Sequence, residues 1–229
     1  MPEISEPIKN LIHTFSEGLF CTLALFFSVL ATALLIAIIC TFIRALKIRV
    51  FQPLLYLYLL IIRGSPLLVQ LFLIYYGLGQ IDFLKESELI WNIFKEPAVT
   101  AWLALSLNSG AYTTLLFTET LEKIEIGQSE AALSLGLSRF QNLRYILFPQ
   151  TWKLSLGAYS NEVLFILKAT ALASTISVMD LTGVTRQLIA QTYDPSYFLI
   201  TALIYLLLNA LILQFFKQFW KNQSKSTIA

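Results

Sequence analysis

Charged and hydrogen-bonding side chains recur inside otherwise apolar stretches of this 229-residue sequence. The stretch between residues 154 and 180 is the richest in them, with Asn161, Glu162, Lys168, Thr170, Ser174 and Asp180. Arg63, Asn108 and Tyr112 interrupt two earlier apolar stretches. Burying a charged group in lipid costs roughly 2.5–3.5 kcal/mol on insertion scales, so such residues are candidates for contact with a polar solute. The pattern indicates reversible binding along a path.

No group of residues indicates covalent chemistry. The sequence has no G-x-x-x-x-G-K-[ST] phosphate loop and no nucleophile next to a base. The single histidine, His13, has no second histidine or cysteine near it in the sequence. Cys21 and Cys40 would lie roughly 28 Å apart on a helix, too far for a disulfide. We therefore expect neither an enzyme nor a chain that binds a metal or cofactor.

The polar residues of the stretch 154–179 form two stripes if this stretch is one helix. Residues seven apart share a helical face, which groups Asn161, Lys168 and Thr175. The spacing i, i+4, i+7 places a second group on the nearly opposite face: Thr170, Ser174 and Ser177. One stripe would line the path, and the other would pack closely against a neighbouring helix, as small polar residues do in membranes. The spacing does not decide between them.

The two acidic residues of this stretch each allow two interpretations. Glu162 either pairs with a basic residue of the preceding connection 119–153 or contacts the solute. Asp180 follows the apolar stretch and either attracts a cation or is simply solvated. The choice depends on burial, which periodicity does not give.

The polar residues of the two earlier stretches are equally open. Arg63 stands in the sequence Arg-Gly-Ser-Pro, which predicts a break in the helix. Broken backbone at membrane depth is tolerated only where protein covers it or a cavity adjoins it, so Arg63 marks either a kink or a cavity. Asn108 and Tyr112 are four residues apart on one helical face and either bond to a neighbouring helix or meet the solute.

The composition requires a membrane. Hydrophobic residues make up 57% of the chain and charged residues only 13%, against about 25% charged residues in soluble domains. The mean hydropathy is +0.70. The net charge of +2 is too small to indicate nucleic-acid binding. We predict an all-α integral membrane protein with five transmembrane helices, at residues 19–43, 54–78, 98–118, 154–179 and 197–216.

Lysine and arginine are distributed unevenly over the connections between these spans. Ten lie after the first span, after the third span and in the tail, and four lie in the remaining connections. Because cytoplasmic segments carry the excess of positive charge, the amino terminus is predicted outside and the carboxyl terminus in the cytoplasm. Residues 1–18 are then an outer interfacial segment, and residues 221–229 a cytoplasmic tail. The outer loop 79–97 either rests on the membrane surface or is a solvated linker.

The cytoplasmic connection 119–153 contains a stretch that favours helix. Its alanine, leucine and glutamate residues predict a helix over 128–135, which Gly136 would end in a left-handed conformation. Ser138 is a typical N-cap for a second helix over 139–147. The result would be a helix–turn–helix on the cytoplasmic face.

This helix–turn–helix has the character of a docking element. It would end at Pro149 and present the small side chains of Ala131 and Ala132, with Glu130 left to pair with a basic group. The motif resembles the EAA loop of bacterial ABC importer permeases in Glu130-Ala131-Ala132-x3-Gly136-x9-Ile146-x-Phe148-Pro149. The usual form ends Ile-x-Leu-Pro, so Phe148 departs from it by a hydrophobic exchange. The resemblance implies that this loop couples the chain to a cytoplasmic ATPase.

The resemblance extends over nearly the whole chain. Four stretches are similar to the polar amino acid permeases of that family: "RGSPLLVQLFLIYYGLGQ" (63–80), "LSLNSGAYTTLLF" (105–117), "YSNEVLFILKATALASTISVMDLTG" (159–183) and "TYDP" (192–195). They are most similar to the M-type subunits of importers for arginine and for histidine, lysine, arginine and ornithine. The resemblance implies the type I ABC importer fold over residues 19–220, in a bacterial inner membrane.

The same resemblance implies partners and a solute. They are a second, unlike permease subunit, an ATPase homodimer that binds ATP and magnesium, a periplasmic binding protein, and L-arginine. Related permeases often have Lys-Asp-Thr where this chain has Lys168-Ala169-Thr170, so an acid that would meet a substrate ammonium group is missing here. The second permease would supply it. A homodimeric permease for glutamine, histidine or cystine and an ion-driven carrier remain as alternatives.

Overall fold

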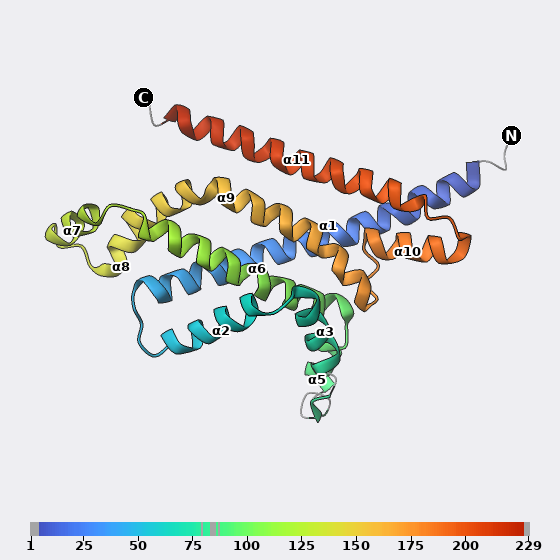
Figure 1. Cartoon of the computed structure of the whole chain (residues 1–229), viewed down its shortest axis with the longest axis horizontal. Coiled ribbons are helices and arrows are strands. Elements are labelled where there is room, and N and C mark those ends of the chain that lie inside the picture. Colours follow the sequence, from blue (N-terminus) through green and yellow to red (C-terminus); the bar gives the residue numbers. More distant parts are fainter. Residues whose placement is uncertain (1–4, 79, 83–85, 87, 227–229) are drawn as a thin grey trace. The chain divides into compact units, whose positions relative to one another are not determined.

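Helices form all the regular structure in the part of the chain that the structure describes, residues 5–78, 80–82, 86 and 88–226 (Figure 1). This computed structural model contains α1 Ser5–Ala45, α2 Gln52–Gly64, α3 Leu67–Leu78, α5 Glu88–Phe94, α6 Pro97–Glu122, α7 Ile126–Ser134, α8 Arg139–Asn142, the π-helix η1 Leu143–Leu147, α9 Phe148–Ala169, the 3₁₀-helix η2 Thr170–Ile176, α10 Leu181–Thr192 and α11 Tyr197–Ser226. The prediction of an all-α chain is confirmed.

Two helices are long and apolar enough to cross a membrane alone, among the residues described. They are Lys9–Ala45 within α1 and Tyr197–Phe219 within α11. Two further crossings arise if a bent helix pair counts as one span, namely α2 with α3 and Arg139–Ile176 with α10. Helix α6 covers the predicted third span but is not apolar enough to count as a third such helix, since buried polar residues such as Ser106 and Thr113 lower its hydropathy. Five spans therefore stay a prediction.

Helix α1 is uninterrupted from Ser5 to Ala45. The sequence predicted a separate interfacial segment over 1–18, ahead of a span that begins at 19. The structure instead continues one helix through this boundary, and residues 1–4 lie outside the described part. Pro7 falls in the first turn of α1, where its missing N–H costs no intrahelical bond. In the predicted outer loop 79–97, residues 79, 83–85 and 87 also lie outside the described part, and α5 forms within it.

The second predicted span is divided, as the sequence Arg-Gly-Ser-Pro indicated. Helix α2 ends at Gly64, and Ser65 is extended with φ −127° and ψ 147°. Pro66 causes this, because its ring disfavours helical backbone at the preceding residue and it has no N–H to donate. The Ser65 hydroxyl donates to the carbonyl oxygen of Ile61 at 2.7 Å, which satisfies one acceptor at the helix end. Helix α3 then starts afresh at Leu67.

The chain divides into two compact units. Unit 1 comprises Met1–Leu30, Leu67–Leu105 and Leu164–Leu211, and unit 2 comprises Ala31–Pro66, Ser106–Val163 and Ile212–Ala229. In unit 1, η2 packs against α3 and α10. Its fully buried side chains include Leu71, Leu167, Ile176 and Leu181. This core fixes the position of the segment 164–192, which carries Thr170, Ser174 and Asp180.

The core of unit 2 is largely aromatic. The fully buried Phe117 of α6 packs against Phe148, Trp152 and Tyr159 of α9, with ring centroids 6.1, 5.9 and 5.9 Å apart. Each such pair adds about 0.5–1.5 kcal/mol beyond its burial. These contacts fix the face that α9 turns toward α6.

A second cluster in unit 2 joins α2 to α6. Leu55 and Leu59 pack against Ala111, and the Tyr58 hydroxyl donates to the carbonyl oxygen of Leu107 at 2.6 Å. This attachment orients the remaining faces of α2, including the one that carries Arg63.

Candidate functional site

Helix α7 ends in a hydrogen-bonded turn at Gly136. The N–H of Leu137 donates to the carbonyl oxygen of Ala132 at 3.2 Å, and the N–H of Gly136 donates to that of Leu133 at 3.0 Å. These two bonds form a Schellman motif. The φ of Gly136 is +85°, a left-handed conformation that glycine adopts without a Cβ penalty. The prediction that Gly136 ends the first helix is confirmed.

Helix α8 begins with a capping box. The hydroxyl oxygen of Ser138 accepts from the N–H of Gln141 at 3.2 Å, and Oε1 of Gln141 accepts from the N–H of Ser138 at 2.9 Å. The predicted N-cap at Ser138 is confirmed, and a cap of this kind contributes about 1 kcal/mol. Both sides of the turn between α7 and α8 are thus closed by hydrogen bonds.

Helix α7 is tied to the helices that follow it, beside which it lies in Figure 1. Nδ2 of Asn142 in α8 donates to the hydroxyl oxygen of Ser129 at 2.6 Å. Nε2 of Gln150 in α9 donates to Oε1 of Gln128 at 2.6 Å. Ala132 lies on the same inner side and is only 2% exposed. A displacement of α7 would therefore act on α8 and on the start of α9.

The opposite side of α7 is open. Glu130 and Ala131 are exposed, and Leu135 exposes 82% of its surface. Leu133 instead lines a cavity together with Ser129 and Asn142. No salt bridge joins Glu130 to another residue in the described part of the chain. The expectation for Ala132 was wrong, because its methyl group supports α7 from inside and is not presented to a partner. The outward surface consists instead of one carboxylate, one methyl group and the side chain of Leu135.

Pro149 does not end the helical unit, contrary to the sequence prediction. It is the second residue of α9, and helical backbone runs from Arg139 through η1 into α9. The π-helix η1, Leu143–Leu147, directly precedes α9. Because the regular α-helical hydrogen bonds are interrupted there, the N–H that proline lacks is not needed for one of them. The predicted coupling loop, residues 119–153, is therefore continuous with α9.

Asp180 is the centre of a buried polar cluster in unit 1. It is 0% exposed and caps α10, with Oδ1 accepting from the N–H of Gly183 at 2.9 Å. Oδ2 accepts from the hydroxyl of Tyr205 in α11 at 3.3 Å. The hydroxyl oxygen of Thr22 in α1 accepts from the N–H of Leu181 at 2.9 Å. Three helices thus meet at the start of α10.

This arrangement corrects the interpretation of Asp180 as a solvated residue. Because both of its oxygens already accept bonds from the chain, the carboxylate fixes the junction in preference to attracting a free cation. Sequence reasoning missed Thr22 and Tyr205, whose partners are 159 and 25 residues away. The one local signal was Gly18, four residues before Thr22. A Cβ at Gly18 would lie 3.2 Å from the carbonyl oxygen of Asp180, so glycine permits the approach of α10.

We expect Asp180→Leu to destabilise the protein by about 2–4 kcal/mol, through loss of the helix cap and an unpaired Tyr205 hydroxyl. Asp180→Asn keeps a capping oxygen and should cost less than about 1 kcal/mol. Thermal unfolding of the purified variants in one detergent checks this order. Equal melting of Asp180→Leu and wild type would remove the structural role. If Asp180→Asn is stable but the half-saturation concentration for arginine uptake rises, Asp180 would instead attract the cationic solute.

The other candidates in unit 1 do not form the predicted stripes. The helix tightens to 3₁₀ geometry at Thr170, and Ser177 is left-handed with φ 71°, so spacing based on 3.6 residues fails beyond Ala169. The hydroxyls of Thr170 and Ser174 donate to the carbonyl oxygens three residues before them. Thr170 is buried beside the Asp180 cluster, where it interacts with Tyr205, while Lys168 is exposed. Of these residues, Lys168 is the most open to a solute.

The candidates in unit 2 have unequal access. Asn161 and Arg63 are exposed, Glu162 is half-buried, and Asn108 is only 3% exposed. Tyr112 is 36% exposed, so it and Asn108 do not share one environment as their spacing suggested. The structure therefore divides the nine predicted residues between two units, and their common contact with one solute stays a prediction.

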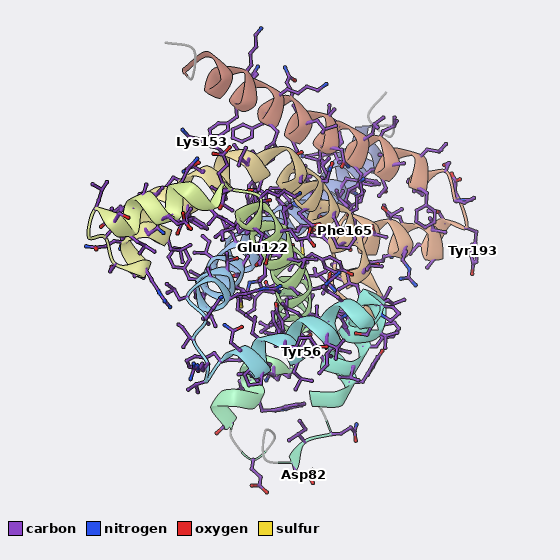
Figure 2. All side chains as sticks on the ribbon, turned by 60° about the vertical axis from the view of Figure 1, so that its left-hand side comes forward. Tyr56, Asp82, Glu122, Lys153, Phe165 and Tyr193 are labelled. Carbon is purple, nitrogen blue, oxygen red and sulfur yellow. The ribbon has the colours of Figure 1, made fainter. Side chains whose placement is uncertain are left out.

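The turn between α10 and α11 carries an exposed tyrosine and an aspartate. Tyr193 is left-handed with φ 57° and is 88% exposed (Figure 2). The N–H of Ser196 donates to Oδ1 of Asp194 at 2.9 Å, and the bonds from Ser196 hold the pKa of that carboxyl below its usual value. This carboxylate therefore remains charged at neutral pH.

Comparison with known proteins identifies relatives over most of the chain. Residues 33–222 match the family described as "Binding-protein-dependent transport system inner membrane component". The nopaline transport system permease protein NocM of Agrobacterium fabrum (strain C58) is 39% identical over 204 residues, which cover 88% of this chain and 85% of the relative. The arginine ABC transporter permease protein ArtM of Escherichia coli (strain K12) is 44% identical over 155 residues, 68% of this chain and 69% of the relative.

A solved structure supports the same assignment. The structure described as an amino acid ABC transporter with histidines superposes with a TM-score of 0.81 at 29% identity. The match covers 94% of this chain and 97% of the other. The fold of this chain is thus one found in a solved amino acid ABC transporter.

Proposed function

We propose, from the premise that the chain belongs to the family of binding-protein-dependent transport system inner membrane components, that it carries L-arginine as one permease subunit of an importer. The chain is a membrane permease of an amino acid ABC importer and not an enzyme. ATP is hydrolysed by a separate ATPase. The resemblance stated from the sequence is confirmed at the level of this family.

The observation that carries the proposal is the structure of α7. The helix is held from inside by its hydrogen bonds to α8 and α9, while Glu130, Ala131 and Leu135 are exposed. A surface of this kind suits the groove of an ATPase. Closure of the ATPase dimer would move α7, and the bonds that Ser129 and Gln128 accept from Asn142 and Gln150 would pass that movement to α8 and α9. Because α9 leads into the polar segment 164–180, ATP binding would alter access to the solute.

The choice of arginine rests on the name of the relative that is 44% identical. Ala169 supplies no acid for the ammonium group, so we propose a second, unlike permease that completes the solute site. The assembly would also contain an ATPase homodimer with ATP and magnesium, and a periplasmic binding protein. It would lie in a bacterial inner membrane, with five spans in each permease.

Gentle purification of the tagged chain from its native membranes tests this assembly. We expect an ATPase and a second permease to accompany it, and ATP hydrolysis to rise several-fold when arginine-loaded binding protein is added. An ATPase without a second permease would favour a homodimer, for which glutamine, histidine and cystine are the solutes to compare. Absence of an ATPase in several mild detergents would favour an ion-driven carrier.

The orientation in the membrane has a separate test. The excess of positive charge predicts that the carboxyl-terminal tail is cytoplasmic. Gln223→Cys, in a chain with Cys21 and Cys40 replaced by serine, should react with a membrane-impermeant maleimide only in inverted vesicles. Labelling of intact spheroplasts would show the opposite orientation. An added cysteine at Glu88, in the predicted outer loop, serves as the matched control.

A further inference from the structure

We propose that unit 2 contains a binding site for one anionic phospholipid, whose phosphate lies between Arg44 and Arg63. The site is a cavity of about 450 Å³ between α1, α2 and α6. Its wall includes both arginines together with Tyr56, Leu59, Leu60 and Leu115. This inference does not depend on which solute the chain carries.

The arrangement follows from the periodicity of α2. Leu55, Leu59 and Ile62 follow the spacing i, i+4, i+7 and pack toward α1 and α6. The adjacent stripe is shifted by one residue and comprises Tyr56, Leu60 and Arg63. Tyr56 and Leu60 are 69% and 54% exposed, and Figure 2 labels Tyr56 on α2. This face of α2 is therefore an exposed, largely apolar surface with the guanidinium group of Arg63 at one end.

The charges of the cavity match an anion. Arg44, in the last turn of α1, supplies a second guanidinium to the same wall, and none of the described residues that line it is acidic. In the described part of the chain, no salt bridge joins Arg44 or Arg63 to a carboxylate. Glu119, one turn along α6 from Leu115, is exposed and makes none either. Two guanidinium groups favour phosphate because each can donate two parallel hydrogen bonds.

The apolar part of the wall distinguishes a lipid from a transported amino acid. Leu59, Leu60 and Leu115 offer hydrocarbon contacts that suit an acyl chain. A cationic amino acid would instead place its own positive group beside Arg44 and Arg63. Basic pockets between transmembrane helices commonly hold anionic head groups, and Arg44 precedes the basic connection with Lys47 and Arg49.

Native mass spectrometry of the full chain tests the site. The chain is equilibrated with equal amounts of phosphatidylglycerol and phosphatidylcholine that carry the same acyl chains. We expect one bound phosphatidylglycerol per chain, at a preference of about tenfold or more over phosphatidylcholine. Arg44→Gln/Arg63→Gln should reduce this preference to about onefold, and Arg44→Lys/Arg63→Lys should keep part of it because the charge remains. Arg49→Gln removes one arginine charge outside the cavity and should keep the full preference.

Several results would overturn the proposal. Equal binding of the two lipids by wild type would do so, as would an equal loss of preference in Arg49→Gln. Displacement of the lipid by millimolar inorganic phosphate would assign the cavity to a free anion. If the double glutamine variant does not fold, the wild-type competition and the double lysine variant decide the matter.

Discussion

Replacing Glu130 with lysine is expected to reduce ATP-driven arginine uptake to less than about a tenth of the wild-type rate, with normal amounts of the chain in the membrane. Glu130 is exposed on the outer side of α7 and forms no salt bridge in the described part of the chain. Reversal of its charge should therefore leave folding within about 0.5 kcal/mol of wild type. At a docking surface the same reversal opposes a basic partner, and like charges in contact cost several kcal/mol. The measurement is uptake into vesicles at equal protein content.

Glu122→Lys provides the matched control for this variant. Glu122 is exposed at the end of α6 (Figure 2), in the same predicted cytoplasmic connection but outside α7. It undergoes the same change of charge and should retain most of the uptake. Glu130→Gln, which removes the charge without reversing it, should give an intermediate rate. Normal uptake by Glu130→Lys, or an equal loss in Glu122→Lys, would contradict a docking role for α7.

Gly183→Ala should destabilise the chain by about 3 kcal/mol or more and lower its apparent melting temperature by about 6 °C or more. A Cβ at this position would overlap the carbonyl oxygen of Val178, which belongs to the backbone and cannot rotate away. It would also lie 3.3 Å from Oδ1 of Asp180. The junction before α10 must therefore open, and the bonds of Asp180 and Leu181 would lengthen with it. Scanning fluorimetry at one heating rate measures the change.

Gly157→Ala is the counterpart in α9. Nothing lies within 4 Å of the position its Cβ would occupy, and the residue is exposed within the helix. Alanine is the better helix former by about 0.5–1 kcal/mol, so this variant should melt at the wild-type temperature or slightly above. If both variants melt alike, the close approach at Gly183 is not a constraint in the protein.

The local features of the predicted coupling loop were predictable because short-range chemistry determines them. Gly136 supplies a left-handed residue and Ser138 a capping hydroxyl, and each requires only neighbours within five positions. The break before Pro66 is predictable for the same reason. Each of these features depends on backbone groups close by in the sequence, whatever the rest of the chain does.

The buried cluster was not predictable because long-range packing determines it. Nothing in the sequence near Asp180 indicates that Tyr205, 25 residues later, will donate to one of its oxygens. The two stripes beyond Ala169 failed because they assumed 3.6 residues per turn through a segment that is 3₁₀. The expectation for Pro149 failed because proline both ends helices and opens them, and the π-turns that decide the case leave no clear pattern of residue types.

The hydroxyl of Thr22 also bears on the order in which the protein is made. It donates to the carbonyl oxygen of Gly18 in its own helix and accepts from Leu181, 159 residues later. At 5–20 residues per second, the ribosome reaches Leu181 roughly 8–30 s after Thr22. During that interval the hydroxyl proton already has its acceptor within α1, so the newly inserted helix carries no unsatisfied donor at this position. The nascent α1 can therefore remain inserted in the bilayer without this partner. The bond from the N–H of Leu181 to the hydroxyl oxygen of Thr22 forms once α10 has been synthesised and inserted.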